Sequence, residues 1–64
     1  MINNIKIGLI GYGYWGKNLA RNLYELETLF AICDSSSKNL DESKKLYPNI
    51  NYFSNIDDLL QSDI

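Results

Sequence analysis

The feature that most constrains the fold of this chain is the spacing of three glycines near its start. Gly11, Gly13 and Gly16 follow the pattern G-x-G-x-x-G. Before them, residues 5–10 form a short run rich in isoleucine, which is typical of a buried strand. After them, residues 17–26 carry apolar side chains at steps of three and four, which is typical of an amphipathic helix. The glycines therefore predict a tight turn from a strand into a helix.

Each glycine has its own physical reason at such a turn. Gly11 permits the sharp change of direction after the strand, and Gly13 lets the main chain approach a pyrophosphate without an intervening Cβ atom. Gly16 lets the helix pack closely on the strand. A helix that begins near Tyr14 directs its free N–H groups and the positive end of its dipole toward the same point. We therefore predict a phosphate-binding loop that needs no basic side chain.

Strand and helix patterns continue to alternate along the chain. The apolar stripe of the first helix is predicted to consist of Leu19, Ala20, Leu23 and Leu26. The apolar run at residues 29–33 predicts the second strand. Residues 39–46 predict a short helix anchored by Leu40 and Leu46, which ends near Tyr47 because that residue precedes a proline.

The last part of the chain predicts a third strand and a third helix. Residues 50–53 form the strand, and Ser54 with Asp57 makes a Ser-x-x-Asp signal for a helix start. The apolar residues of that helix are Ile56, Leu59 and Leu60. This alternation predicts an α/β fold with right-handed crossovers and a parallel sheet. We expect the N-terminal half of a doubly wound Rossmann fold, with strand order 3-2-1, as one incomplete domain over residues 1–64.

An acidic residue ends the second predicted strand. Asp34 lies 18 residues beyond Gly16 (34 − 16), close to the separation of about 20 expected in dinucleotide-binding units. A carboxylate there accepts hydrogen bonds from ribose hydroxyls and repels a 2′-phosphate, so NAD is favoured over NADP. Lys38, nearby, keeps NADP as an alternative, and a simple turn-capping role for Asp34 is the other alternative.

Composition excludes several other classes of function. The formal net charge is −2 and the six basic residues are spread along the chain, which argues against a nucleic-acid partner. Cys33 is the single cysteine and there is no histidine, so no disulfide or metal framework is predicted, and Cys33 is expected to be a buried thiol. No segment approaches the ~20 apolar residues of a membrane span, and no signal peptide is recognisable. We expect a cytoplasmic protein.

Residues 11–23, Gly-Tyr-Gly-Tyr-Trp-Gly-Lys-Asn-Leu-Ala-Arg-Asn-Leu, followed by Ala-Ile-Cys-Asp at residues 31–34, resemble the N-terminus of the Gfo/Idh/MocA oxidoreductases. The sequence is most similar to the branch that oxidises nucleotide-linked sugars in polysaccharide biosynthesis, such as UDP-N-acetylglucosamine and UDP-N-acetylglucosaminuronate 3-dehydrogenases. The segments at residues 52–54 and 57–60 also match this family, so the resemblance covers the whole chain.

The resemblance implies transfer of hydride between a sugar hydroxyl and NAD(P). It also implies a role for individual residues: Gly11, Gly13 and Gly16 form the phosphate loop, Tyr14 and Trp15 supply backbone donors, and Asp34 and Ser35 contact the ribose. Tyr12 completes the predicted cofactor-binding loop. We expect the rings of Tyr12, Tyr14 and Trp15 to pack on neighbouring structure or line the cleft entrance, with stacking on nicotinamide or substrate as the alternative.

The catalytic part of the family pattern has no counterpart in this sequence. The Glu-Lys-Pro segment with the catalytic lysine and the histidine-bearing helix would lie beyond Ile64, so no catalytic residue is predicted and a nucleotide sugar would bind only with the missing substrate domain. The chain is therefore expected to be a gene fragment or a shortened piece, whose first strand is an open edge prone to self-association. The alternatives are a non-catalytic nucleotide-binding module and an inert fragment.

Overall fold

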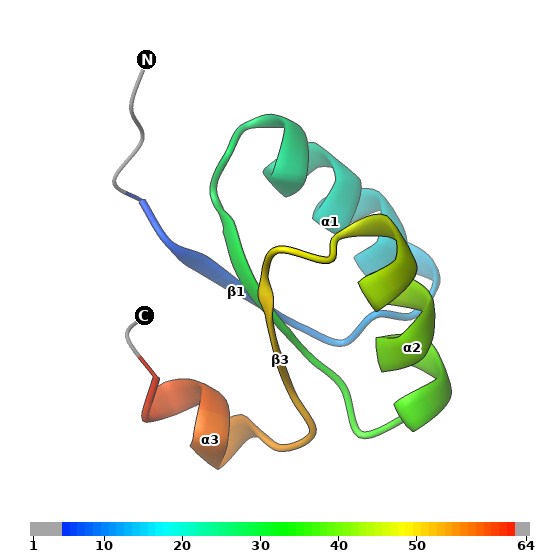
Figure 1. Ribbon diagram of the computed structural model, residues 1–64, viewed down its shortest axis with the longest axis vertical. Helices are drawn as coiled ribbons and strands as arrows, with labels where there is room; N and C mark the ends of the chain where they lie inside the picture. The colour runs from blue at the N-terminus through cyan, green and yellow to red at the C-terminus, as the bar shows by residue number, and fades with distance from the viewer. Residues whose placement is uncertain (1–4, 63–64) are drawn as a thin grey trace.

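The computed structural model describes residues 5–62, in which three strands alternate with three helices (Figure 1). In chain order they are β1 (Ile7–Ile10), α1 (Tyr14–Glu25), β2 (Leu29–Cys33), α2 (Ser37–Leu46), β3 (Asn51–Phe53) and α3 (Ile56–Leu60). All the strand pairs are parallel. The α/β class and the parallel sheet predicted from the sequence are therefore confirmed for this part of the chain.

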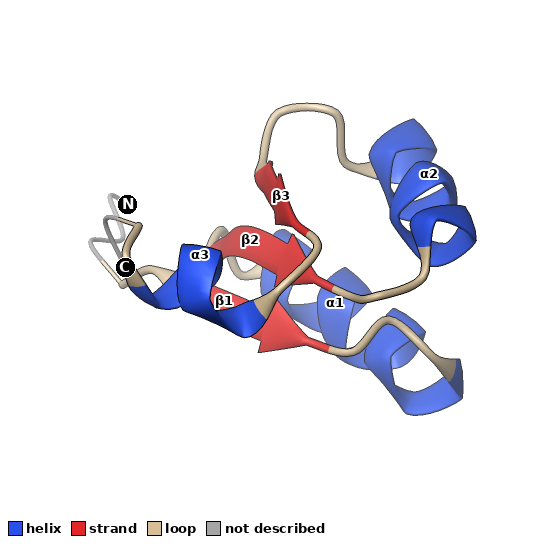
Figure 2. Ribbon diagram, turned by 90° about the horizontal axis from the view of Figure 1, so that it is seen from below, coloured by secondary structure: helices blue, strands red, loops and turns tan. Residues whose placement is uncertain are grey.

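The three strands form one sheet in the order β1-β2-β3, with β2 in the centre. Helices α1 and α2 cover one face of the sheet, and α3 covers the opposite face (Figure 2). The chain therefore changes face after β3. Because all three strands run in the same direction, the loops that follow them gather at one edge of the sheet.

The central strand supplies the core on both faces. Leu29 and Ile32 pack in the cluster beneath α1 and α2, whereas Ala31 and Cys33 pack against α3. Simple alternation would not place Leu29 and Ile32 on one face, but the register of β1 and β2 shifts so that Phe30 is an extra residue. Cys33 is buried, as predicted for a structural thiol.

Helix α1 packs on the sheet through small residues. Gly16 and Ala20 are buried and Leu23 is half-buried, whereas Leu19 and Leu26 are 51% and 64% exposed. The prediction that Leu19 and Leu26 belong to the core-facing stripe is therefore wrong. The helix contacts the sheet at steps of four and three from Gly16, and a large side chain there would hold it away from the strands.

Helix α2 begins at Ser37, two residues before its predicted start, because the Ser36 hydroxyl accepts a hydrogen bond from the Asn39 N–H at 3.2 Å. Leu40 is buried as predicted, but the second predicted anchor, Leu46, is exposed. Tyr47 takes that place in the core. The helix ends at Leu46, in agreement with the prediction.

Tyr47 belongs to a group of tyrosines between the helices and the sheet. Its ring centroid lies 4.8 Å from that of Tyr24. The hydroxyl of Tyr52 donates to the main-chain carbonyls of Ser43 and Tyr47. These hydrogen bonds connect the end of α2 to β3.

The N-cap of α3 is Asn55 and not Ser54, so the predicted Ser-x-x-Asp start is wrong by one position. Asn55 Oδ1 accepts from the Asp58 N–H at 2.9 Å, and Asn55 Nδ2 donates to the Asp58 carboxylate at 3.0 Å. Leu59 is buried against the sheet, whereas Ile56 and Leu60 are exposed. Two overlapping capping signals occur in this segment, and the longer-reaching amide forms the cap.

Candidate functional site

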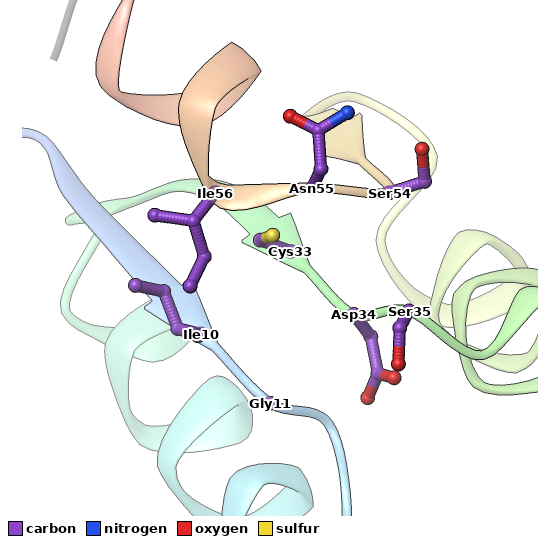
Figure 3. Close-up of a pocket in the computed structure, with 8 residues that line it drawn as sticks. All are labelled: Ile10, Gly11, Cys33, Asp34, Ser35, Ser54, Asn55 and Ile56. Carbon is purple, nitrogen blue, oxygen red and sulfur yellow. The ribbon is translucent and has the colours of Figure 1, made fainter.

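A cavity of about 400 Å³ opens at the edge of the sheet where the three strands end (Figure 3). It is lined by Ile10, Gly11, Cys33, Asp34, Ser35, Ser54, Asn55 and Ile56. Each strand therefore contributes its last residue or the loop after it. The carboxyl edge of a parallel sheet is the usual place for a ligand in open α/β folds.

The cavity has an apolar side and a polar side. Ile10 and Ile56 point toward one another next to Cys33, and Asp34 and Ser35 lie across the opening (Figure 3). Burial raises the pKa of the Cys33 thiol, with smaller contributions from the nearby carboxylates, so the thiol stays neutral and apolar in character. Such a cavity suits a flat apolar group that carries hydroxyl groups at one end.

The glycine loop connects β1 to α1 at the edge of this cavity. Gly11 has a φ of +95°, a conformation that residues with a side chain rarely adopt, and its N–H donates to the Cys33 carbonyl at 2.7 Å. A Cβ atom on Gly16 would lie 2.1 Å from the Gly11 carbonyl oxygen. The predicted turn at Gly11 and close packing at Gly16 are therefore both present.

Gly13 differs from the other two glycines, because neither its backbone conformation nor a neighbouring atom of residues 5–62 requires a glycine there. A Cβ atom built on Gly13 would meet no atom of these described residues within 4 Å, and its φ of −84° is ordinary. Gly13 is the N-cap of α1, and the first helical hydrogen bond runs from the Lys17 N–H to its carbonyl at 3.0 Å. The space in front of this loop is open in the structure.

The N-terminus of α1 has no side-chain cap among the described residues, and its first turn contains no acidic residue. The first N–H groups of a helix have no partner inside the helix. The rings of Tyr14 and Trp15 are 79% and 75% exposed and pack edge-to-face at 5.6 Å. These two rings lie on the surface and do not line the cavity. Tyr14 and Trp15 therefore contribute to the loop through their backbone N–H groups.

Tyr12 has a different position from that of its two aromatic neighbours. Its side chain is only 2% exposed and packs in the core with Ala20 and Ile32. Burial is the main cause that raises the pKa of its hydroxyl. Its backbone N–H donates to Asp34 Oδ2 at 2.7 Å. Tyr12 therefore anchors the glycine loop to the core.

Asp34 lies at the end of β2, where it joins the glycine loop to α2. Its Oδ1 accepts from the Ser36 N–H at 2.8 Å, and its Oδ2 accepts from the Tyr12 N–H at 2.7 Å and from Asn39 Nδ2 at 3.1 Å. The hydrogen bonds from Ser36 and Tyr12, with a smaller one from Asn39, lower the pKa of Asp34 against the opposing effect of burial. The carboxylate is therefore ionised at neutral pH.

The structure thus brings Gly11, Asp34 and Ser35 to one cavity and places the N-terminus of α1 in the same glycine loop. Sequence reasoning missed Asn39, which binds the carboxylate, and Ile10 and Ile56, which form the apolar side. The Ser36-x-x-Asn39 spacing fits a helix cap formed by the Asn39 N–H, but it gave no signal for the contact between the Asn39 side chain and Asp34. The pairing of the two isoleucines depends on the return of α3 over the sheet, which no local pattern indicates.

Two basic residues near the loop have surface positions. Lys17 Nζ lies 3.4 Å from Glu42 Oε1, and both side chains are about half exposed, so the pair contributes little to stability. Lys38 is exposed in the first turn of α2. Within residues 5–62, no three His, Cys, Asp or Glu side chains gather as a metal site would require.

In the same described segment, no helix has both the length and the apolar character needed to cross a lipid bilayer. Comparison of the chain with protein-family models, with curated proteins and with solved structures finds no match.

Proposed function

We propose that this chain binds NAD at the carboxyl edge of its sheet, as the cofactor-binding part of an oxidoreductase that acts on a nucleotide-linked sugar. The observation that carries the proposal is one juxtaposition. The uncapped N-terminus of α1 and the ionised carboxylate of Asp34 are held together by the Tyr12 N–H, beside an open cavity. One group attracts phosphate and the other accepts hydroxyl groups, and a dinucleotide presents both.

The pyrophosphate is assigned to the glycine loop. The first-turn N–H groups of α1, including those of Tyr14 and Trp15, supply donors and a partial positive charge. The open space at Gly13 allows phosphate oxygens to approach the main chain. This mode of binding fits a loop whose nearest lysine, Lys17, is paired with Glu42.

The adenosine half is assigned to the cavity. Its apolar side, with Ile10 and Ile56, suits an adenine ring, and Asp34 and Ser35 are placed for the ribose. A 2′-phosphate at this position would meet the negative charge of Asp34. NAD is therefore proposed over NADP.

The arrangement of helices supports the doubly wound Rossmann assignment, with the strands in the order 3-2-1. Two successive crossovers place α1 and α2 on one face, and the third helix lies on the other face. In doubly wound folds this change of face accompanies a switch to the other side of the first strand, and the ligand lies at the switch. In such a fold the next strand would lie beside β1, whose outer edge is unpaired within the described part.

The sugar-nucleotide substrate is proposed from the resemblance of the glycine-loop sequence to the Gfo/Idh/MocA oxidoreductases. None of the residues in this chain is assigned a catalytic role. Binding and orienting the dinucleotide is the part of the reaction that these residues perform. The chemistry, including the choice of sugar, would require groups outside residues 5–62.

Calorimetric titration of the chain with NAD, NADP and AMP tests the proposal. We expect saturable binding of NAD, weaker binding of NADP because of Asp34, and measurable binding of AMP. The absence of heat with all three ligands would overturn the proposal and favour an inert fragment. NADP bound as tightly as NAD would overturn the assignment of Asp34 to the ribose.

A non-catalytic nucleotide-binding module is the second candidate, and the cavity is the observation that favours it. The cavity, which Asp34 helps to line, is large enough for an adenosine group without the rest of a dinucleotide. In that case AMP would bind as tightly as NAD. A proposed partner common to both functions is a second copy of the chain, paired through the open edge of β1. Size-exclusion chromatography at micromolar concentration checks this, and a monomeric profile would contradict it.

A further inference from the structure

The carboxylate of Asp34 already accepts three hydrogen bonds from the protein. An ionised carboxylate has two oxygens and about four lone-pair sites for hydrogen bonds. Oδ2 accepts two hydrogen bonds, from the Tyr12 N–H at 2.7 Å and from Asn39 Nδ2 at 3.1 Å. Oδ1 accepts one, from the Ser36 N–H at 2.8 Å. By this count Oδ2 is saturated, and Oδ1 keeps one acceptor site for a ligand.

The two donors on Oδ2 are held by structure around them. Tyr12 cannot withdraw its N–H without moving a ring that is buried in the core. Asn39 lies in the first turn of α2, and its own N–H donates to the Ser36 hydroxyl, so its side chain starts from a fixed backbone. Release of a site on Oδ2 to a ligand would therefore require either a change in the core around Tyr12 or rotation of the Asn39 side chain away from Asp34.

We infer that Asp34 accepts only one sugar hydroxyl, through Oδ1, and that Asn39 is a positioning residue that acts through Asp34 by occupying Oδ2. The inference rests on the proposed function, since it concerns how the same site takes a ribose. The second ribose hydroxyl then falls to another group, and Ser35, whose side chain lines the cavity beside Asp34, is placed for it (Figure 3). By the lone-pair count, a second hydroxyl could bind the carboxylate only by displacing one of its present donors, such as the Tyr12 N–H or the Asn39 amide.

Binding of AMP, 2′-deoxy-AMP and 3′-deoxy-AMP tests the inference by calorimetry. We expect one of the two deoxy compounds to bind about tenfold or more weakly than AMP, as loss of one hydrogen bond to a charged group requires. The other should lose about threefold or less. Equal large losses for both compounds that both disappear in Asp34→Asn would show that the carboxylate grips two hydroxyls, and would overturn the inference.

The role of Asn39 is tested with Asn39→Leu, and Asn22→Leu is the matched control because Asn22 is exposed near the other end of α1. In Asn39→Leu we expect weaker AMP binding and a smaller difference between the two deoxy compounds. The carboxyl carbon of Asp34, followed by NMR during an acid titration, should titrate at higher pH than in the wild type. Asn22→Leu should change neither quantity.

The titration separates this inference from the proposed function because it needs no ligand. An unchanged Asp34 titration in Asn39→Leu would overturn the positioning role, whatever the binding data show. Failure of the wild-type chain to bind NAD, NADP and AMP would overturn the proposed function, and the single-hydroxyl contact with it. A changed titration together with equal large losses for both deoxy compounds in the wild-type chain would overturn the single-hydroxyl contact alone.

Discussion

The N-terminus of α1 and the N-terminus of α2 lie at the same edge of the sheet but differ in how they are capped. At α2 the Ser36 hydroxyl accepts the Asn39 N–H, so the protein satisfies its own helix end. At α1 the N-cap is Gly13, and within residues 5–62 no side chain takes that place. The third helix resembles α2, because Asn55 caps it.

The difference supports the proposal that the N-terminus of α1 receives a ligand. A helix N-terminus attracts a negative group, and α3 carries Asp57 and Asp58 in its first turn, whereas the first turn of α2, like that of α1, has no acid. Helix α1 is the longest of the described helices, with 12 residues, and has no acid in its first turn. Glycine at the N-cap costs only a few tenths of a kcal/mol compared with serine or aspartate. An uncapped end is therefore compatible with stability and leaves the N–H groups for a ligand.

The largest expected change in stability distinguishes Gly16, which has a structural role, from Gly13, which is proposed to bind the ligand. Gly16→Ala places a Cβ atom 2.1 Å from the Gly11 carbonyl oxygen, so the helix must move away from the strand. We expect a loss of about 3 kcal/mol, a large share of the roughly 3–10 kcal/mol expected for a chain of this size. Urea unfolding followed by circular dichroism measures it. A loss below about 0.5 kcal/mol would contradict the close packing.

Asp34→Asn should break the connection between the two helix ends. The replacement removes the charge that accepts the N–H groups of Tyr12 and Ser36, and we expect a loss of about 2 kcal/mol at pH 7. The pKa of Asp34 is lowered in the folded state, so its contribution is fully present above the unfolded pKa of about 4 and is lost as pH falls through the folded value.

Unfolding measured from pH 7 to pH 2 checks the sign of this effect. The difference in the free energy of unfolding between wild type and Asp34→Asn should be constant from pH 7 to about pH 5 and should shrink at lower pH. A difference that grows in acid would show that Asp34 is not a stabilising carboxylate. Asp41→Asn, on the exposed surface of α2, is the control for a change of net charge alone.

The starts of α1 and α3 differ in how well they could be predicted from the sequence. The glycine spacing predicted the turn at Gly11 and the close packing at Gly16, because both are local demands on the backbone. The cap of α3 was placed at Ser54 instead of Asn55, since Ser54 and Asn55 each have an aspartate three residues later. Local spacing alone does not distinguish two equivalent signals.

Contacts between distant parts of the chain were harder to predict from the sequence than local turns. Leu19 and Leu26 follow helical spacing, yet the sheet covers the face of Gly16 and Ala20, because close approach outweighs side-chain size there. The extra residue in β2 and the burial of Tyr12 both arise from contacts between elements. The same applies to Asn39, whose partner Asp34 became evident only in three dimensions.

Removal of the existing cap from α2 should have a smaller effect. Ser36→Ala leaves the Asn39 N–H without its acceptor, and we expect a loss of about 1 kcal/mol. Ser37→Ala, one position later and exposed, should change stability by less than about 0.5 kcal/mol. Thermal unfolding of the two variants makes the comparison, and equal melting temperatures would show that the Ser36 cap contributes nothing.

The smallest expected change in stability comes from giving α1 the cap that it lacks. Gly13 has open space for a side chain and a backbone conformation that aspartate adopts, so Gly13→Asp should raise the stability by a few tenths of a kcal/mol. Asn18→Asp adds the same charge to α1 one turn further on, at an exposed position, and serves as the control. A clear destabilisation by Gly13→Asp would contradict the open space in front of the loop.

The same pair of variants provides the most direct test of the claim that the N-terminus of α1 is reserved for the pyrophosphate of NAD. Titration of the wild-type chain with NAD should show saturable binding, and Asn18→Asp should bind within about threefold of it. Gly13→Asp should bind about a hundredfold more weakly (roughly 2.7 kcal/mol), because its carboxylate occupies the N–H groups and repels phosphate. NAD binding that survives unchanged in a folded Gly13→Asp variant would contradict the claim.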